Sequence, residues 1–222
     1  HGIWGTAANN VYAVGYNGTI VRYNGSTWAK QSSNVTTSLR SVWGSGPSNL
    51  FAVGANTVVR YNGSSWTTMD PGVSSWLSSV AGLSDQDVVA VAANGEATRF
   101  NGSTWSPLTT NTSANLNGVW DVGGRYVVVG HKVGVGGALL QVSGTTVQDI
   151  AGGFAAGRLY AVGGAGKMAY AVGESTIVQY DGSTWSDITP PGMTETLAGV
   201  WAAGAKNVFV VGSNGALWHG QL

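Results

Sequence analysis

A seven-residue turn recurs through the chain and constrains its fold more than any other feature. The stretch RYNGSTW at residues 22–28 returns in near copies at 60–66, 99–105 and 179–185. A second marker, Ala-Val-Gly or a close variant, occupies residues 13–15, 52–54, 90–92, 128–130, 171–173 and 210–212. Most of its steps are about 38–39 residues, and such a period is typical of solenoids and propellers.

Four short strands are predicted within one repeat, taken from residues 39–69. The runs LRSVWG and LFAVG flank a turn, SGPSN, in which proline presets φ. TVVRY alternates again, and SWTTM follows it as the fourth strand. Asn-Gly between them predicts a tight hairpin, because both central residues of such a turn tolerate positive φ. Antiparallel strands joined in this way form a propeller blade.

We therefore predict an all-β fold, a six-bladed β-propeller of four-stranded antiparallel blades whose last blade is three-stranded. The whole chain, 1–222, is one predicted domain. Its repeats span about 1–38, 39–76, 77–115, 116–157, 158–196 and 197–222. The sixth repeat ends after its third strand, so the edge at Ala216–Gly220 is expected to take a strand partner. Residues upstream of His1 in a longer precursor, or a second protein, would supply that strand.

The repeated tryptophans are predicted to pack between blades, since a tryptophan in such a place buries roughly 150–250 Å². This group comprises Trp28, Trp66, Trp105 and Trp185 from the turns, and Trp4, Trp43, Trp120 and Trp201 from the first strands. Arg22, Arg60 and Arg99 share one repeat position and are expected to cover the ring beneath them on the strand surface.

Composition excludes several functions. Charged residues make up 9% of the chain and the formal net charge is zero, so no nucleic-acid partner is expected. The chain has no cysteine and no apolar run long enough to span a membrane, and we expect no cofactor and no metal site. The histidines, His1, His131 and His219, lie outside any nucleophile-elbow context, so no catalytic constellation is recognisable.

The pattern VWGSGPSNLFAVG, followed by NTVVRYNGSSW, resembles repeats of secreted bacterial β-propellers of the myxobacterial type. It is similar, more distantly, to Asp-box (BNR) and Ycf48-like propellers, whose turn reads Asp-x-Gly-x-Thr-Trp. This chain departs from the Asp-box spacing, because Asp181 and Gly182 are adjacent and the other copies carry asparagine. The resemblance implies a propeller in a bacterial protein that is secreted or displayed at the cell surface. It leaves the activity open, since propellers carry hydrolases, lectins and scaffolds alike.

Candidate binding residues stand where the repeat breaks its own rule. The loop GHKVGVGGA (130–138) is expanded, and the linker at 149–160, which contains Phe154, is lengthened. Trp76 replaces the small polar residue that other copies carry before the first strand, and Arg40 and Asn117 share one position within that strand. The predicted ligand-binding residues are Trp76, His131, Lys132, Arg158, Arg40 and Asn117.

By propeller geometry these breaks are expected to share one loop-rich face, with Arg40 and Asn117 at the mouth of a central channel. An exposed tryptophan surrounded by Asn, Arg and His suits a sugar, because the ring stacks on C–H groups while polar side chains bind hydroxyls. The favoured hypothesis is a non-enzymatic binding or adhesion module, lectin-like or protein-binding. The alternatives are a glycan-active hydrolase or lyase on the same face, a structural assembly unit that uses the sixth-blade edge, and plain drift in the irregular fourth repeat.

Overall fold

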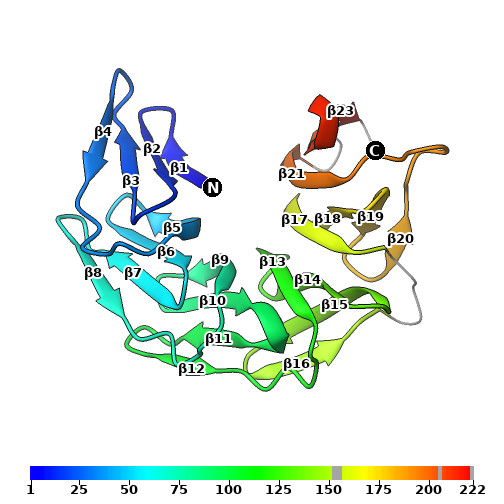
Figure 1. Ribbon diagram of the computed structural model, residues 1–222, viewed down its shortest axis with the longest axis horizontal. Helices are drawn as coiled ribbons and strands as arrows, with labels where there is room; N and C mark the ends of the chain where they lie inside the picture. Colours follow the sequence, from blue (N-terminus) through cyan, green and yellow to red (C-terminus); the bar gives the residue numbers. More distant parts are fainter. Residues whose placement is uncertain (152–156, 205–206, 221–222) are drawn as a thin grey trace. The chain divides into compact units, whose positions relative to one another are not determined.

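The computed structural model describes residues 1–151, 157–204 and 207–220. Its strands form six antiparallel sheets, five of four strands and one of three (Figure 1). In the described residues the only helical segments are the short 3₁₀ turns Ala93–Gly95 and Ser213–Gly215. The protein is therefore a six-bladed β-propeller whose last blade has three strands, as the sequence predicts.

The chain divides into two compact units, His1–Leu108 and Thr109–Leu222. The first unit holds blades one to three. Blade one consists of β1 (Gly2–Ala7), β2 (Asn10–Val14), β3 (Ile20–Tyr23) and β4 (Trp28–Gln31). Blade two consists of β5 (Leu39–Gly46), β6 (Asn49–Gly54), β7 (Thr57–Tyr61) and β8 (Trp66–Met69), and blade three of β9 (Leu77–Ser84), β10 (Asp87–Ala92), β11 (Ala97–Phe100) and β12 (Trp105–Pro107).

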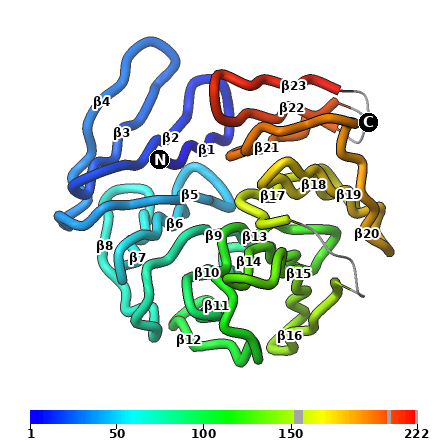
Figure 2. Tube along the Cα trace, turned by 45° about the vertical axis from the view of Figure 1, so that its right-hand side comes forward, coloured from blue at the N-terminus to red at the C-terminus, as the bar shows by residue number. Residues whose placement is uncertain are grey.

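The second unit holds blades four to six. Blade four consists of β13 (Asn115–Asp121), β14 (Tyr126–Lys132), β15 (Gly136–Ser143) and β16 (Thr146–Asp149). Blade five consists of β17 (Leu159–Ala165), β18 (Met168–Gly173), β19 (Thr176–Tyr180) and β20 (Trp185–Asp187), and blade six of β21 (Leu197–Gly204), β22 (Asn207–Gly212) and β23 (Leu217–Gly220). Within each blade the chain runs back and forth between neighbouring strands (Figure 2).

The repeated turn is closed by a backbone hydrogen bond and by the side chain of its first residue, and only its glycine has positive φ; in blade one the Asn24 N–H donates to the Thr27 carbonyl at 3.2 Å. In blade one, Asn24 Oδ1 accepts hydrogen bonds from the backbone N–H groups of Ser26 and Thr27, both at 2.9 Å. Gly25 has a φ of 98°, whereas Asn24 is not among the residues of positive φ. Asn62, Asn101 and Asp181 close their turns in the same way. The Asn-Gly pair thus predicts the hairpin correctly but not the hydrogen bonds that stabilise it. An aspartate at the same position, Asp181, supplies the same side-chain acceptor.

The first strand of blade two is longer than predicted. Gly46 pairs with Asn49, so the expected turn at 45–49 shrinks to Pro47 and Ser48. A register shift between Gly44 and Gly46 accommodates the extra residues. Backbone pairing of Gly46 extends the strand. Hydrophobic alternation in the sequence does not predict this extension, because glycine has no side chain to alternate.

Apolar clusters between neighbouring blades hold each unit together. In unit one, Trp66 of blade two lies 6.2 Å from the ring of Tyr12 in blade one, and Trp105 of blade three lies 5.7 Å from Phe51 in blade two. In unit two, Trp185 packs against the buried cluster shared by blades four and five. In these blades the turn tryptophan therefore packs on apolar residues of the preceding blade. Each of the two neighbouring sheets buries apolar surface of the other.

The first-strand tryptophans Trp4, Trp43 and Trp120 are half-buried and pack against these interblade clusters. Trp28 and Trp201 are exposed, and their rings contact Tyr23 and Phe209 of their own blades. Trp28 belongs to the first blade of its unit and Trp201 to the last. Neither therefore has, inside its own unit, the neighbouring blade that covers its counterparts.

Two of the three repeated arginines of the third strands, Arg22 and Arg60, lie over aromatic rings as predicted. The guanidinium carbon of Arg22 is 5.6 Å from the ring centroid of Tyr12, and that of Arg60 is 5.3 Å from Phe51. Arg99 forms an ion pair with Asp87 at 2.6 Å. All three also reach the first residue of the second strand, so they brace the blade rather than face a ligand.

Candidate functional site

Every first strand from blade two to blade six carries one extra residue near its start. In blade two, Leu39 pairs with Gly54 and Ser41 with Val53, which leaves Arg40 between two consecutive pairs. The residues at this β-bulge are Arg40, Ser78, Asn117, Tyr160 and Ala198. A bulge bends the strand and redirects the extra side chain, so this position is free to vary while the sheet stays intact.

In blades two, four, five and six a close approach at the bulge accounts for the glycine that ends the Ala-Val-Gly marker, whereas blade three carries Ala92 opposite its bulge. A Cβ at Gly54 would lie 1.9 Å from the carbonyl oxygen of Ser38, and one at Gly173 would lie 1.7 Å from that of Arg158. The loop after the second strand hydrogen-bonds the linker at the same place, from Ala55 N–H to the Ser38 carbonyl at 3.0 Å. We call this end of a blade, where bulge, loop and linker meet, the loop end.

Trp76 and Arg40 meet at the loop end of unit one. The guanidinium carbon of Arg40 lies 5.4 Å from the indole centroid of Trp76. Trp76 nevertheless remains 55% exposed. A cation over one part of the ring orders the side chain and leaves the rest of its apolar surface available to a ligand.

The linker that carries Trp76 is anchored by a carboxylate. Glu96 accepts hydrogen bonds from the backbone N–H groups of Ser75, at 2.7 Å, and Ser74, at 3.0 Å. The Ser75 N–H is the main cause of a pKa of Glu96 below its usual range. Glu96 therefore stays ionised at neutral pH and fixes the residues that precede Trp76.

Two further residues of unit one join this end, and neither was predicted. The rings of His1 and Tyr16 stand edge to face with centroids 4.3 Å apart, and Tyr16 is 69% exposed. Beside Tyr16 lies a hollow whose lining includes Asn17, Lys30, Gln31, Ser32, Asn34, Val35 and Thr36. Tyr16 stands where other repeats have Ala55, Ala93 or Glu174, so the rule that singled out Trp76 would also have found it.

In unit two the loop end carries a connected polar cluster. Asn117 Nδ2 lies 3.0 Å from His131 Nδ1, and the His131 ring stands 6.1 Å from that of Tyr160. The Tyr160 hydroxyl donates to Glu174 Oε1 at 2.9 Å, and Arg158 Nη1 lies 3.5 Å from the same oxygen. The predicted residues Asn117, His131 and Arg158 thus come together, joined by the unpredicted Tyr160 and Glu174.

Hydrogen bonds fix the orientation of the Asn117 side chain in this cluster. Asn117 Nδ2 also donates to the Leu159 carbonyl at 2.7 Å, which identifies that atom as the amide nitrogen. His131 Nδ1 accepts a hydrogen bond from this amide when the ring carries its proton on Nε2. Burial, followed by the bond to Glu174, raises the pKa of Tyr160, so the phenol remains a donor at neutral pH.

The rest of the fourth-blade loop forms a tight turn. Lys132 is half-buried and its carbonyl accepts from the Val135 N–H at 3.1 Å. Val133 and Val135 at the tip are strongly exposed. Phe154, in the lengthened linker, lies outside the described residues.

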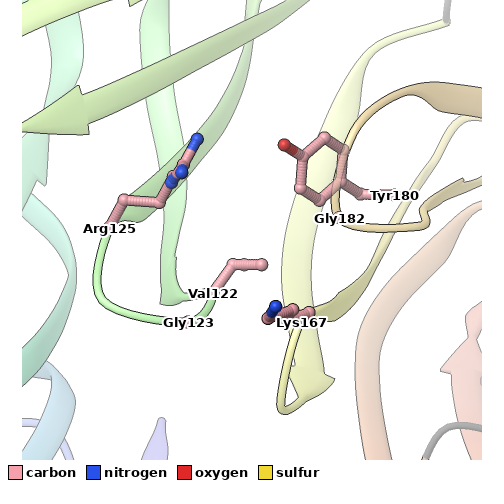
Figure 3. A pocket seen from close by; sticks show the side chains of 6 residues that line it. All are labelled: Val122, Gly123, Arg125, Lys167, Tyr180 and Gly182. Atoms are coloured by element: carbon pink, nitrogen blue, oxygen red, sulfur yellow. The ribbon is translucent and has the colours of Figure 1, made fainter.

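A small pocket lies at the other end of blades four and five (Figure 3). It is lined by Val122, Gly123, Arg125, Lys167, Tyr180 and Gly182. Tyr180 is the last residue of β19, and the others come from the turns that join first to second and third to fourth strands. None of the predicted binding residues lines it, and Arg125 also donates to Gln141 Oε1 at 3.2 Å.

Among residues 1–151, 157–204 and 207–220, no three metal-ligating side chains gather into a site. The same ranges contain no helix of the length and hydropathy that a membrane crossing needs.

Comparisons with known proteins support the β-propeller fold and do not assign a family or an activity. No family model and no curated protein matches the sequence. The structure of YCF48 bound to D1 peptide is 17% identical, with a TM-score of 0.73, covering 99% of this chain and 76% of that one. A streptogramin B lyase is 11% identical, with a TM-score of 0.77, covering 100% of this chain and 82% of its own.

An ancestral GH74 enzyme is 14% identical, with a TM-score of 0.77 over 98% of this chain and 35% of the enzyme. At such identities the likeness shows the fold alone. The predicted distant similarity to Ycf48-like propellers is therefore found, and neighbours of this fold include both a peptide-bound protein and enzymes.

Proposed function

We propose that this propeller is a non-enzymatic, lectin-like binding module that recognises carbohydrate through the loop end of unit one. The observation that carries the proposal is the half-exposed indole of Trp76, ordered by Arg40. Sugars present C–H faces that stack on such a ring and hydroxyls that bind neighbouring polar groups. The exposed Tyr16 and the hollow lined by Asn17, Ser32 and Asn34 offer a second surface of the same chemistry.

The low charge of the molecule supports a neutral ligand. Charged residues are 9% of the chain and the net charge is zero, so long-range steering of a polyanion is weak. A protein ligand remains the alternative, since a protein of this fold, YCF48, is described as bound to a peptide.

A glycan array with wild type, Trp76→Ala and Trp28→Ala tests the proposal. Trp28→Ala is the matched control, because it removes an exposed tryptophan from β4, away from the loop end. We expect wild type and Trp28→Ala to bind the same glycans and Trp76→Ala to lose about two- to twelvefold in signal, the range for one stacking contact of about 0.5–1.5 kcal/mol. An array without signal, or one on which Trp76→Ala matches wild type, would refute carbohydrate recognition at this site.

A second candidate, a glycan-active hydrolase or lyase, is favoured by one observation. The Tyr160 hydroxyl meets the Glu174 carboxylate beside Arg158 and His131, which is a set able to donate and accept protons. Turnover of array-positive glycans by wild type, lost in both Tyr160→Phe and Glu174→Gln, would support this role. Absence of turnover with binding intact would leave the binding module as the function.

We also propose that the protein works outside a bacterial cell, secreted or at its surface, where such glycans occur. Fractionation of the producing cells tests this location, and recovery of the protein only from the cytoplasm would contradict it.

A further inference from the structure

The sixth blade presents an open strand edge. Its sheet order is β21-β22-β23, and among the described residues β23 pairs only with β22. The other five blades each have a fourth strand beside the third. An unpaired edge offers backbone N–H and C=O groups to any extended segment that reaches it.

β23 keeps the internal geometry of a third strand. Phe209 pairs with His219, as Tyr12 pairs with Arg22 in blade one. The His219 ring stacks on Phe209 with centroids 4.3 Å apart, and its Nε2 lies 2.6 Å from Asn207 Oδ1. Arg22 makes the same two contacts, over Tyr12 and with Asn10. The strand is therefore preformed and in the register of its counterparts.

The register defines which backbone groups face the edge. Gly212 N–H donates to the Ala216 carbonyl, so by the alternation of an antiparallel ladder Trp218 and Gly220 bond β22. The N–H and C=O groups of Leu217 and His219 then point away from β22. At the position of Leu217, the carbonyls of other blades accept an N–H from the following segment. These bonds run from Leu108 to Ala97 at 2.9 Å, from Ile150 to Leu139 at 2.9 Å and from Ile188 to Ile177 at 3.0 Å.

The apolar surface at the edge is uncovered. Trp218 is 39% exposed, although its counterparts Val59, Leu140 and Val178 are buried. In blade two, Val59 shares its buried cluster with Trp66 of the fourth strand. Gly220 occupies the place of Tyr61, whose ring lies 5.2 Å from Trp66. A glycine there leaves room for an incoming aromatic ring.

We propose that the β23 edge binds an extended segment of a second polypeptide as an added antiparallel strand. The segment carries an aromatic residue opposite Gly220 and a large aliphatic residue three positions later, opposite Leu217. This pattern is the one that fourth strands and the residue after them show, as in Trp185 to Ile188 and Trp105 to Leu108. Main-chain bonds to Leu217 and His219 supply affinity, and the aromatic residue sets the register.

A labelled peptide that copies residues 182–190, GSTWSDITP, tests the edge by fluorescence anisotropy with the 222-residue chain. In the proposed register, the N–H groups of the serine at 186 and the isoleucine at 188 point at β23, and that of the aspartate at 187 points away. We expect saturable binding that N-methylation at 188 weakens by about tenfold or more, the effect of one lost hydrogen bond, whereas N-methylation at 187 changes it by less than about threefold. Equal effects of the two methyl groups, or no binding by the parent peptide, would overturn the proposal.

A pair of protein variants places the peptide on β23. His219→Pro removes the edge-facing N–H, and His219→Ala removes the same side chain but keeps that group. Binding retained by His219→Ala and lost by His219→Pro supports the edge, and equal binding by both contradicts it. Trp76→Ala is expected to bind the peptide like wild type, so failure of this proposal and failure of the carbohydrate site are separate results.

Discussion

At the scale of single residues, tryptophan does two different jobs in this chain. Trp66 is buried against the preceding blade, whereas Trp76 stands half in solvent at a loop end. Trp66 occupies a position at which other repeats also carry tryptophan, whereas Trp76 occupies one at which they carry small polar residues. Repeated positions therefore carry the fold, and positions that break the repeat are free to carry function.

Trp66→Ala is expected to lower the free energy of unfolding by about 3–5 kcal/mol, because it removes a fully buried ring from an interblade cluster. Thr68→Ala, an exposed change on the same strand, is the control and is expected to cost less than about 0.5 kcal/mol. Urea unfolding measures both. Similar losses in the two variants would show that the ring does not bind the blades together.

Asp181 gives the repeated turn of blade five a pH dependence that the asparagine turns lack. Its pKa falls from 3.8 to about 2, chiefly because the Thr184 backbone N–H donates to the carboxylate. Since the folded pKa is depressed, the stabilisation is complete above about pH 4 and is lost as pH falls through about 2. Asp181→Asn should therefore lose less stability than wild type between pH 4 and pH 2. Thermal unfolding across this range tests it, and parallel curves would contradict it.

At the scale of elements, the β-bulge in the first strand links fold to site. In blades two, four and five it comes with a close backbone approach to the preceding linker, and it places Arg40, Asn117 and Tyr160 at the loop ends of their units. A bulge has no signature in hydrophobic alternation. The sequence thus places Arg40 and Asn117 at one position of the first strand, but it predicts neither the bulge nor Tyr160 as the third member.

Gly54→Ala tests the bulge directly. The new Cβ would lie 1.9 Å from the Ser38 carbonyl oxygen, so the linker must shift, at a cost of about 1–3 kcal/mol. Gly46→Ala is the control, since a Cβ there meets nothing within 4 Å. Melting temperatures compare the two, and an unchanged value for Gly54→Ala would show that the approach is not needed.

The candidate sites were partly predictable for physical reasons. Trp76, Asn117 and His131 stand out because they differ from equivalent residues in other repeats. The stacking of Arg40 on Trp76 and the bond from Tyr160 to Glu174 depend on side-chain directions that the repeat does not encode. The turns were predicted through Asn-Gly, although a side-chain acceptor joins the backbone hydrogen bond in closing them.

At the scale of the whole molecule, the balance of charge is the dominant feature. Ten acidic and ten basic side chains give a formal net charge of zero at pH 7. Affinity for a neutral glycan is therefore expected to change by less than about twofold between 50 and 500 mM salt, because few ion pairs contribute to it. A polyanionic ligand would instead lose affinity steeply over this range. Titration calorimetry at both salt concentrations distinguishes them.

The most direct test of loop-end recognition follows the indole N–H resonances of the ten tryptophans by NMR. The glycan with the strongest array signal is titrated into labelled protein, and Trp76→Phe assigns the Trp76 peak. Recognition at the loop end predicts that the Trp76 resonance shifts on binding while those of buried Trp66 and Trp105 stay in place. A Trp76 resonance that does not move while the glycan binds would contradict it.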